Sequence, residues 1–143
     1  MEGIGKLFSG FRSAASGLAA ERARVDVIAR NVANAQTTST PEGGPYRRQV
    51  VRFEPILARL ADGRMEARGV RVTGIEQDGT TPFQRLFDPA HPDADDKGFV
   101  SMPNVNAARE MADLITAMRA YEANAAIQES FVQMAERALR SVM

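Results

Sequence analysis

The two ends of the chain carry apolar side chains at the spacing of long helices. In residues 4–35, positions a and d of a heptad repeat are occupied by Ile4, Leu7, Phe11, Ala14, Leu18, Glu21, Val25, Ile28, Val32 and Ala35. Because only Glu21 is charged, the 3.5-residue period of a coiled coil continues through four heptads. The pattern predicts a helix about 48 Å long, whose narrow apolar stripe needs a partner.

A second heptad series occupies the other end of the chain. It comprises Ala107, Met111, Leu114, Met118, Tyr121, Ala125, Gln128, Val132, Ala135, Leu139 and Val142. No glycine follows residue 98 and no proline follows residue 103, so nothing interrupts a helix of about 55 Å capped by Asn104 or Asn106. Further apolar side chains flank the series, and a stripe this wide predicts more than one neighbouring helix. We expect the two helices to pair antiparallel, with other chains covering the surplus apolar surface.

Small and polar side chains lie beside the first series. Gly3, Gly10 and Gly17 are seven residues apart, and glycine costs about 1 kcal/mol against alanine inside a helix. They indicate either close approach by another backbone or, for Gly3 and Gly10, a frayed helix start. Asn31 and Asn34 share one helix face. Their amides either bond a neighbouring helix and fix its register or, for Asn34, belong to a fraying helix end.

The middle of the chain has a different composition. All seven prolines lie between residues 41 and 103, and residues 37–45 are typical of a loop. Residues 48–54 and 69–76 predict strands, with Val70, Val72 and Ile75 facing inward, and residues 56–63 either extend the first strand or turn. The predicted fold is α+β, mainly α. Its parts are an N-terminal helix (1–36), a loop and small β-rich middle with a proline-rich connector (37–103), and a C-terminal helix (104–143).

Charge and composition exclude several kinds of function. Eighteen basic and eighteen acidic residues give no net charge, which argues against a nucleic-acid partner. There is no cysteine and one histidine, so disulfides, thiolate chemistry and histidine-rich metal sites are not expected. No stretch resembles a membrane span or a cleaved signal peptide. We therefore expect neither membrane insertion nor export by a cleaved signal.

An acidic loop is the only candidate for metal chemistry. Residues 88–96 contain Asp88, His91, Asp93, Asp95 and Asp96, which could hold a hard cation. However, the spacing lacks the glycine and closing glutamate of a calcium loop, and Pro89 and Pro92 predict a stiff, extended connector. We accordingly expect no metal, no cofactor and no enzymatic activity.

Several segments resemble one family. Residues 16–37 (SGLAAERARVDVIARNVANAQT) are similar to the N-terminal signature of the flagellar axial proteins, and Ala120-Tyr-Glu-Ala-Asn resembles their C-terminal signature. The middle segments GPYR (44–47), GVRVTGI (69–75), DPAHPDA (88–94) and GFVSMPNVN (98–106) resemble the FlgC-type proximal rod proteins of the bacterial flagellar basal body. Two departures are a loop before Tyr46, where the wider family has a Gly-Tyr pair, and Glu122, where glutamine is common.

The resemblance implies a structural role. Such proteins pair their terminal helices into a coiled-coil-like domain and stack helically into a shaft that carries motor torque and surrounds the axial export channel, with the β-rich middle outside. The implied partners are other copies of the chain, other rod proteins, the adaptor between rod and basal ring, and the flagellar type III export apparatus. The implied location is the periplasmic rod, and a cytoplasmic coiled-coil adaptor is the alternative.

The predicted site is therefore a subunit interface along both helices. Its expected members are Leu7, Phe11, Gly17, Leu18, Val25, Ile28, Asn31, Val32, Asn34, Met111, Leu114, Met118, Tyr121, Asn124, Val132 and Leu139. Asn31, Asn34 and Asn124 are the candidate register-setting amides.

Overall fold

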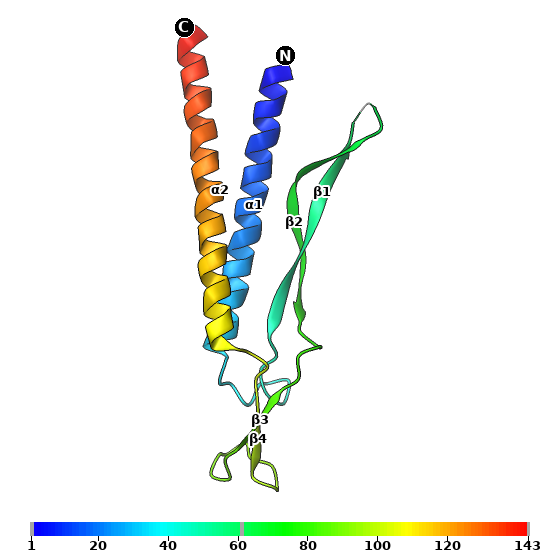
Figure 1. The fold of residues 1–143 in the computed structure, drawn as a ribbon, viewed down its shortest axis with the longest axis vertical. Helices are drawn as coiled ribbons and strands as arrows, with labels where there is room; N and C mark the ends of the chain where they lie inside the picture. The colour runs from blue at the N-terminus through cyan, green and yellow to red at the C-terminus, as the bar shows by residue number, and fades with distance from the viewer. Residues whose placement is uncertain (1, 61, 143) are drawn as a thin grey trace.

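Two long antiparallel helices and a long β-hairpin lie side by side in the computed structural model (Figure 1). The structure describes residues 2–60 and 62–142, and the side chains within residues 9–60 and 62–140. Helix α1 spans Glu2–Ala33 and helix α2 spans Ala107–Val142. Both chain ends lie at one end of the molecule, and a smaller hairpin lies at the other (Figure 1). The α+β, mainly α fold class is confirmed.

The ends of both helices follow from their local sequence. The Asn106 side-chain oxygen accepts a hydrogen bond from the Arg109 amide at 3.1 Å, so Asn106 is the N-cap of α2. At the C-terminus of α1, the Asn34 side chain donates to the Arg30 carbonyl at 2.9 Å. The Thr37 hydroxyl in turn donates to the Asn34 side-chain oxygen at 3.1 Å. Asn34 therefore satisfies its own helix end, and among the described residues its side chain bonds its own helix and the loop that follows.

The middle of the chain forms two antiparallel hairpins. Strands β1 (Gln49–Arg59) and β2 (Met65–Gln77) pair from Gln49 opposite Gln77 to Arg59 opposite Met65. Strands β3 (Gln84–Phe87) and β4 (Phe99–Met102) form the second pair. Strand β1 continues past Pro55, where the register shifts, because a bulge in a two-stranded ribbon tolerates a residue without an amide hydrogen.

Helix α1 lies between α2 and the long hairpin (Figure 1). The Ser16 hydroxyl accepts a hydrogen bond from the Val70 amide at 3.1 Å. At neighbouring Gly69, with φ +137°, a side chain would collide with Ser16. The absence of a Cβ therefore lets β2 approach α1.

One strand prediction is wrong. Val70 is half-buried, but Val72 and Ile75 are exposed instead of facing inward. A two-stranded ribbon that touches one helix has no second layer to cover it, so most of its apolar side chains stay in solvent.

The loop between β3 and β4 also differs from the predicted extended connector. It folds into successive turns, in which the His91 amide bonds the Asp88 carbonyl and the Ala94 amide bonds the His91 carbonyl. The Asp95 side chain accepts the Lys97 and Phe99 amides, both at 2.9 Å, and pairs with Arg85. The aspartates stabilise the turns through these local bonds, which is why two prolines do not hold the segment extended.

Candidate functional site

Asn31 is the centre of a buried polar junction at the end of α1. Its side chain is 0% exposed. Its amide group donates to the Gln49 carbonyl at 2.9 Å, and its oxygen accepts the Gln49 amide at 2.9 Å and the Tyr46 hydroxyl at 3.0 Å. The side chain thus bonds the backbone of β1 as a paired strand would. These bonds attach the start of the long hairpin to α1.

Glu110 connects the same junction to α2. Its carboxylate is 1% exposed, and it accepts hydrogen bonds from the Asn31 amide at 3.0 Å and from Arg48 Nε at 2.6 Å. Arg48 therefore neutralises an acid that would be costly to bury alone. Burial raises the pKa of Tyr46, with the Glu110 charge adding to the rise and the Arg30 charge opposing it. The Tyr46 phenol stays protonated and donates to Asn31.

Asn104 and Asp78 complete the junction on the side of the second hairpin. Asn104 accepts the Arg48 amide at 2.7 Å and donates to the carbonyls of Asp78 and Thr81. The Asp78 carboxylate accepts the hydroxyls and amides of Thr80 and Thr81. These hydrogen bonds, the side-chain bonds from Thr80 and Thr81 most of all, lower the pKa of Asp78. Every segment that leaves the helices is thereby fixed to the junction.

Most of this junction is not predicted by the sequence pattern. The sequence pattern indicates Asn31 as a polar contact and Asn104 only as a possible helix cap, and it predicts no role for Tyr46, Arg48, Asp78 and Glu110. Asn104 offered a signal, because only one of Asn104 and Asn106 is needed as a cap.

The two helices meet along a line with a constant heptad register. A Cβ added at Gly10 would lie 2.6 Å from the Phe131 ring, and one at Gly17 would lie 3.1 Å from the Asn124 side chain. The contact at Gly17 and Asn124 lies seven residues along each helix from the contact at Gly10 and Phe131. The bond between Asn31 and Glu110 lies a further fourteen residues along each helix in the same direction. The approach at both glycines comes from side chains of α2 and not from its backbone. Gly3 lies where no surroundings are described.

This contact line is displaced from the predicted a/d series. On α1 it follows the glycine row and the d position, where Ala14 and Ile28 are buried. On α2 it follows the row of Glu110, Ala117 and Asn124, and Ala117 is fully buried. The displacement arises because glycine leaves space for Asn124 and Phe131, while the long hairpin occupies another side of α1.

As a result, a row of apolar side chains on α2 faces solvent. Among the described side chains of α2, the row is Met111, Met118, Ala125, Val132 and Leu139, and every member except half-buried Ala125 is exposed. Val132 is 46% exposed and Leu139 is 69% exposed. An isolated helix pair gains nothing from a continuous apolar row in water, so the row is typical of a surface covered by another molecule.

The predicted interface residues fall into distinct groups. Ile28 and Asn31 are buried within the chain, Gly17 and Asn124 contact each other, and Asn34 caps its own helix. Asn124 also donates to the Ala120 carbonyl of its own helix. The half-buried members are Phe11, Leu18, Val25, Val32, Leu114 and Tyr121, and the exposed ones are Met111, Met118, Val132 and Leu139. Leu7 lies outside the described side chains. A role for these residues between subunits stays a prediction.

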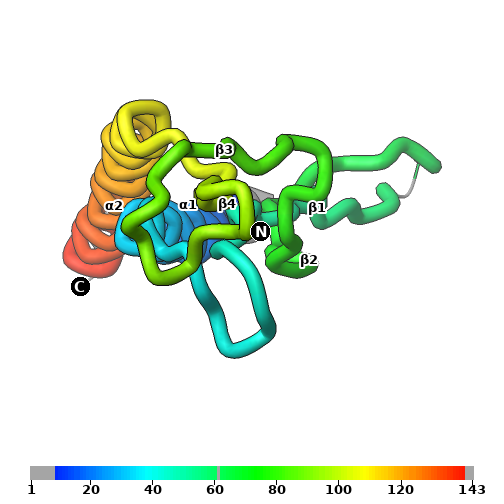
Figure 2. The backbone as a smooth tube through the Cα atoms, turned by 90° about the horizontal axis from the view of Figure 1, so that it is seen from below, coloured from blue at the N-terminus to red at the C-terminus, as the bar shows by residue number. Residues whose placement is uncertain are grey.

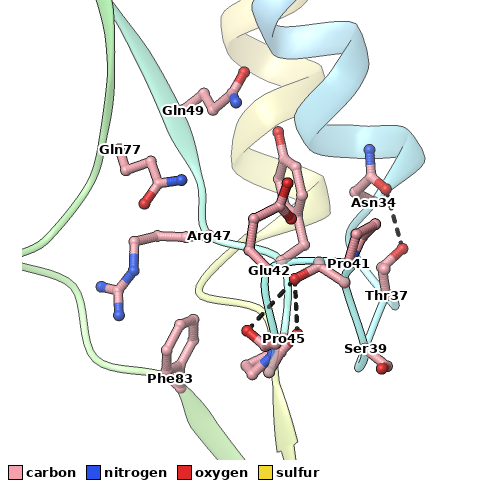
Figure 3. Close-up of a pocket in the computed structure, with 14 residues that line it drawn as sticks. Asn34, Thr37, Ser39, Pro41, Glu42, Pro45, Arg47, Gln49, Gln77 and Phe83 are labelled. Atoms are coloured by element: carbon pink, nitrogen blue, oxygen red, sulfur yellow. Dashed lines mark hydrogen bonds between the residues drawn. The ribbon is translucent and has the colours of Figure 1, made fainter.

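A hollow of about 570 Å³ lies beside the loop of residues 37–46 (Figure 3). The loop projects away from the helices (Figure 2). Across the hollow, the Arg47 guanidinium lies 4.3 Å from the centre of the Phe83 ring and donates to the Asp78 carbonyl at 3.2 Å. The described lining residues include one carboxylate, that of Glu42, so the hollow holds no pair of acids for acid–base catalysis.

The described residues contain neither a candidate metal-binding group nor a candidate membrane span. No group of three or more histidine, cysteine or acidic side chains is placed to hold a metal ion among them. Within the same residues, neither helix has a stretch that is both long and apolar enough to cross a bilayer.

Comparison with known proteins identifies related chains. Residues 11–39 match the family described as "Flagella basal body rod protein", and residues 96–141 match "Flagellar basal body rod FlgEFG protein C-terminal". The flagellar basal-body rod protein FlgC of Borreliella burgdorferi is 44% identical, over 93% of this chain and 95% of its own. FlgC of Bacillus subtilis is 37% identical, over 92% and 95%, and FlgC of Salmonella typhimurium is 38% identical, over 80% and 81%.

Proposed function

Because this chain belongs to the FlgC family of flagellar basal-body rod proteins, we propose that it is a structural subunit of the proximal rod. In this role it assembles with copies of itself and with other rod proteins into a helical shaft. The shaft transmits motor torque and surrounds the axial export channel. The proposed further partners are the adaptor between rod and basal ring and the type III export apparatus, and no catalysis is involved.

The observation that carries this proposal is the exposed apolar row of α2. A shaft under torque must resist sliding between subunits, so each long helix should lie between several others. Met118 and Val132 face solvent in the single chain, although side chains of this kind are stabilised by burial. A partner helix in the rod would bury them.

The polar junction supports the same role in a second way. Asn31, Arg48 and Glu110 fix the start of the long hairpin to both helices. A force on the hairpin would therefore reach the helix pair through several hydrogen bonds, one of which is a buried ion pair. The hairpin would then move with the shaft.

The experiment uses two substitutions at one exposed position. Val132→Asp should remove the chain from isolated basal bodies and abolish motility, whereas Val132→Ile, which keeps an apolar side chain, should preserve both. Because Val132 is 46% exposed, the aspartate should change the stability of the single chain by no more than about 0.5 kcal/mol. Ile28 suits this test less well because it is 5% exposed, and an aspartate there would unfold the chain itself.

Two outcomes would contradict the proposal. One is normal motility with Val132→Asp. The other is recovery of the wild-type chain only in the cytoplasmic fraction and not with detergent-resistant basal bodies, as expected of a cytoplasmic adaptor.

A further inference from the structure

The exposed apolar row of α2 is accompanied by a row of acids. Glu122, Glu129 and Glu136 follow Met118, Ala125 and Val132 by four residues each, and all three are exposed. Residues four apart are neighbours on a helix surface, so the carboxylates border the apolar row along one side. Arg119 and Arg137 lie farther round the helix than the acids. We call the apolar row and its three glutamates the acidic stripe.

The outward side of α1 has the opposite character. The series Arg12, Ala15, Ala19, Arg22, Asp26, Arg30 and Ala33 repeats at three- and four-residue intervals, so it lies on one helix face. Every member is exposed except half-buried Ala15. Three arginines and one aspartate give this face a positive charge. Its alanines leave space for larger apolar side chains of another helix, and we call it the arginine face.

The arginines and glutamates of these two surfaces form no ion pair within the part of the chain that the structure describes. Among the described residues, none of Arg12, Arg22, Arg30, Glu122, Glu129 and Glu136 forms an ion pair. The long hairpin differs, because most of its exposed charges pair internally, as Arg52 does with Glu76 and Arg71 with Glu54. Of the described charged residues in its two strands, Arg59 alone forms no ion pair. The two helix faces therefore carry more unpaired charge with which to recognise a partner than the hairpin does.

A hollow beside the acidic stripe has room for a side chain of an incoming helix. It measures about 420 Å³ and is lined by the apolar or aromatic residues Val25, Met118 and Tyr121 and by the charged residues Arg22, Asp26 and Glu122. Arg22 and Asp26 are also members of the arginine face, so the two surfaces border the same hollow. Two of the three charged lining residues are acidic. This combination suits an arginine whose aliphatic stem packs on the apolar wall while its guanidinium reaches the carboxylates.

We propose that the acidic stripe on α2 of one copy packs against the arginine face on α1 of the next copy. The inference rests on the proposed function and specifies which surfaces meet. Two acidic stripes would repel each other, as would two arginine faces, so closed dimers between like surfaces are disfavoured. When two copies meet through one contact between unlike surfaces, one surface of each kind stays free, and further contacts of the same kind propagate into a filament.

Charge reversal tests this pairing in basal bodies. Glu122→Lys with Glu129→Lys, and separately Arg12→Glu with Arg22→Glu, should each reduce the amount of the chain in isolated basal bodies at least tenfold. The four substitutions combined in one chain should restore it, because the attraction is then reversed but intact. All positions are exposed, and thermal unfolding of each purified variant checks that the chain still folds.

Cross-linking provides a second, independent readout. The chain has no cysteine, so Ala19→Cys and Val132→Cys introduce the only thiols. Within one chain these positions lie about 15 Å apart along the helix pair, too far for a disulfide. One tagged copy carries Ala19→Cys, and a second copy with a different tag carries Val132→Cys. Because the register between copies decides which thiols meet, Met118→Cys and Ala125→Cys are tested in the second copy in the same way. A short bismaleimide should join the α1 thiol of one copy to a stripe thiol of another.

The inference and the proposed function fail in different ways. Absence of the wild-type chain from basal bodies would overturn the proposed function. If the wild-type chain is present but the fourfold variant stays absent, or if cross-links join only like positions, the pairing of these two faces is wrong and the rod assignment stands. Normal assembly of either charge-reversed variant would also overturn the pairing.

Discussion

Removing the Glu110 carboxylate should destabilise the whole chain, because this buried acid joins both helices to the start of β1. In Glu110→Ala, the Arg48 guanidinium loses its partner at 2.6 Å, and the buried Asn31 amide loses one of its two acceptors. An unsatisfied buried polar group costs about 1–3 kcal/mol, and breaking a buried ion pair costs about 3–5 kcal/mol.

The expected loss of folding free energy lies near the lower end of the range for a broken buried ion pair. Arg48 keeps partial contact with water, since its side chain is 23% exposed, and Asp78 lies 3.8 Å away as a second acid. Asn31 keeps its bond to the Gln49 carbonyl. We therefore expect a loss of about 3 kcal/mol, which for a chain of this size lowers the melting temperature by about 10 °C.

The assay is thermal and urea unfolding of the purified chain, followed by circular dichroism at 222 nm. Glu136→Ala removes an exposed acid from the same helix and should change the stability by no more than about 0.5 kcal/mol. Equal melting temperatures for Glu110→Ala and Glu136→Ala would refute the reasoning, because the buried acid would then contribute no more than a surface one.

Three further perturbations have expected outcomes. Gly17→Leu should force Asn124 away from α1 and lower the free energy of unfolding by about 1–3 kcal/mol. Gly17→Ala combined with Asn124→Ala should leave the stability nearly unchanged, and a Gly17→Leu variant as stable as the wild type would contradict the contact. Because the folded-state pKa of Asp78 is lowered, its stabilisation is present above the unfolded value near 4 and is lost as pH falls below it. Asp78→Asn should flatten that part of the melting-temperature profile, and an unchanged slope would contradict this. In hydrogen exchange, amides near Ile28 and Ala117 should be protected longer than those near Leu139, and uniform protection along α2 would be unexpected.

The long helices are the part of the fold that the sequence predicts best. The heptad series of residues 4–35 and 107–142 place both helices within a few residues of their observed bounds, because helical periodicity is a local signal repeated many times. The spacing of Gly10 and Gly17 predicts close approach by another backbone, but the atoms that approach them are side-chain atoms of Phe131 and Asn124.

The junction could not be predicted in the same way. Glu110 reads as an ordinary acid in the first turn of a helix, and Arg48 as a polar residue at the start of a strand. Their pairing with Asn31 joins residues 79 positions apart in the chain, and no periodic pattern reports such a contact. The exposed apolar row on α2 could not be predicted either. The a/d series shows which residues of α2 are apolar, but it does not show which side of the helix contacts α1.

The division into an inner helical domain and an outer middle domain remains a prediction. The long hairpin lies along α1, and the bond from the Val70 amide to Ser16 holds it there (Figure 1). A middle segment packed in this way would lie on the outside of a shaft only if the opposite side of the helix pair faces the other subunits. The hollow at Val25 is lined only by residues of α1 and α2, which is consistent with subunit contacts on the side of the helix pair away from the hairpin.

The most direct test of the account is thiol labelling of Val132→Cys, performed on the purified chain and on intact basal bodies that contain it. The account predicts rapid labelling in the purified chain, where this position is 46% exposed, and strong protection in the basal body, where a neighbouring helix covers the row. Equally rapid labelling in both samples would show that α2 faces solvent in the assembled rod, and would contradict the claim that its apolar row is a subunit interface.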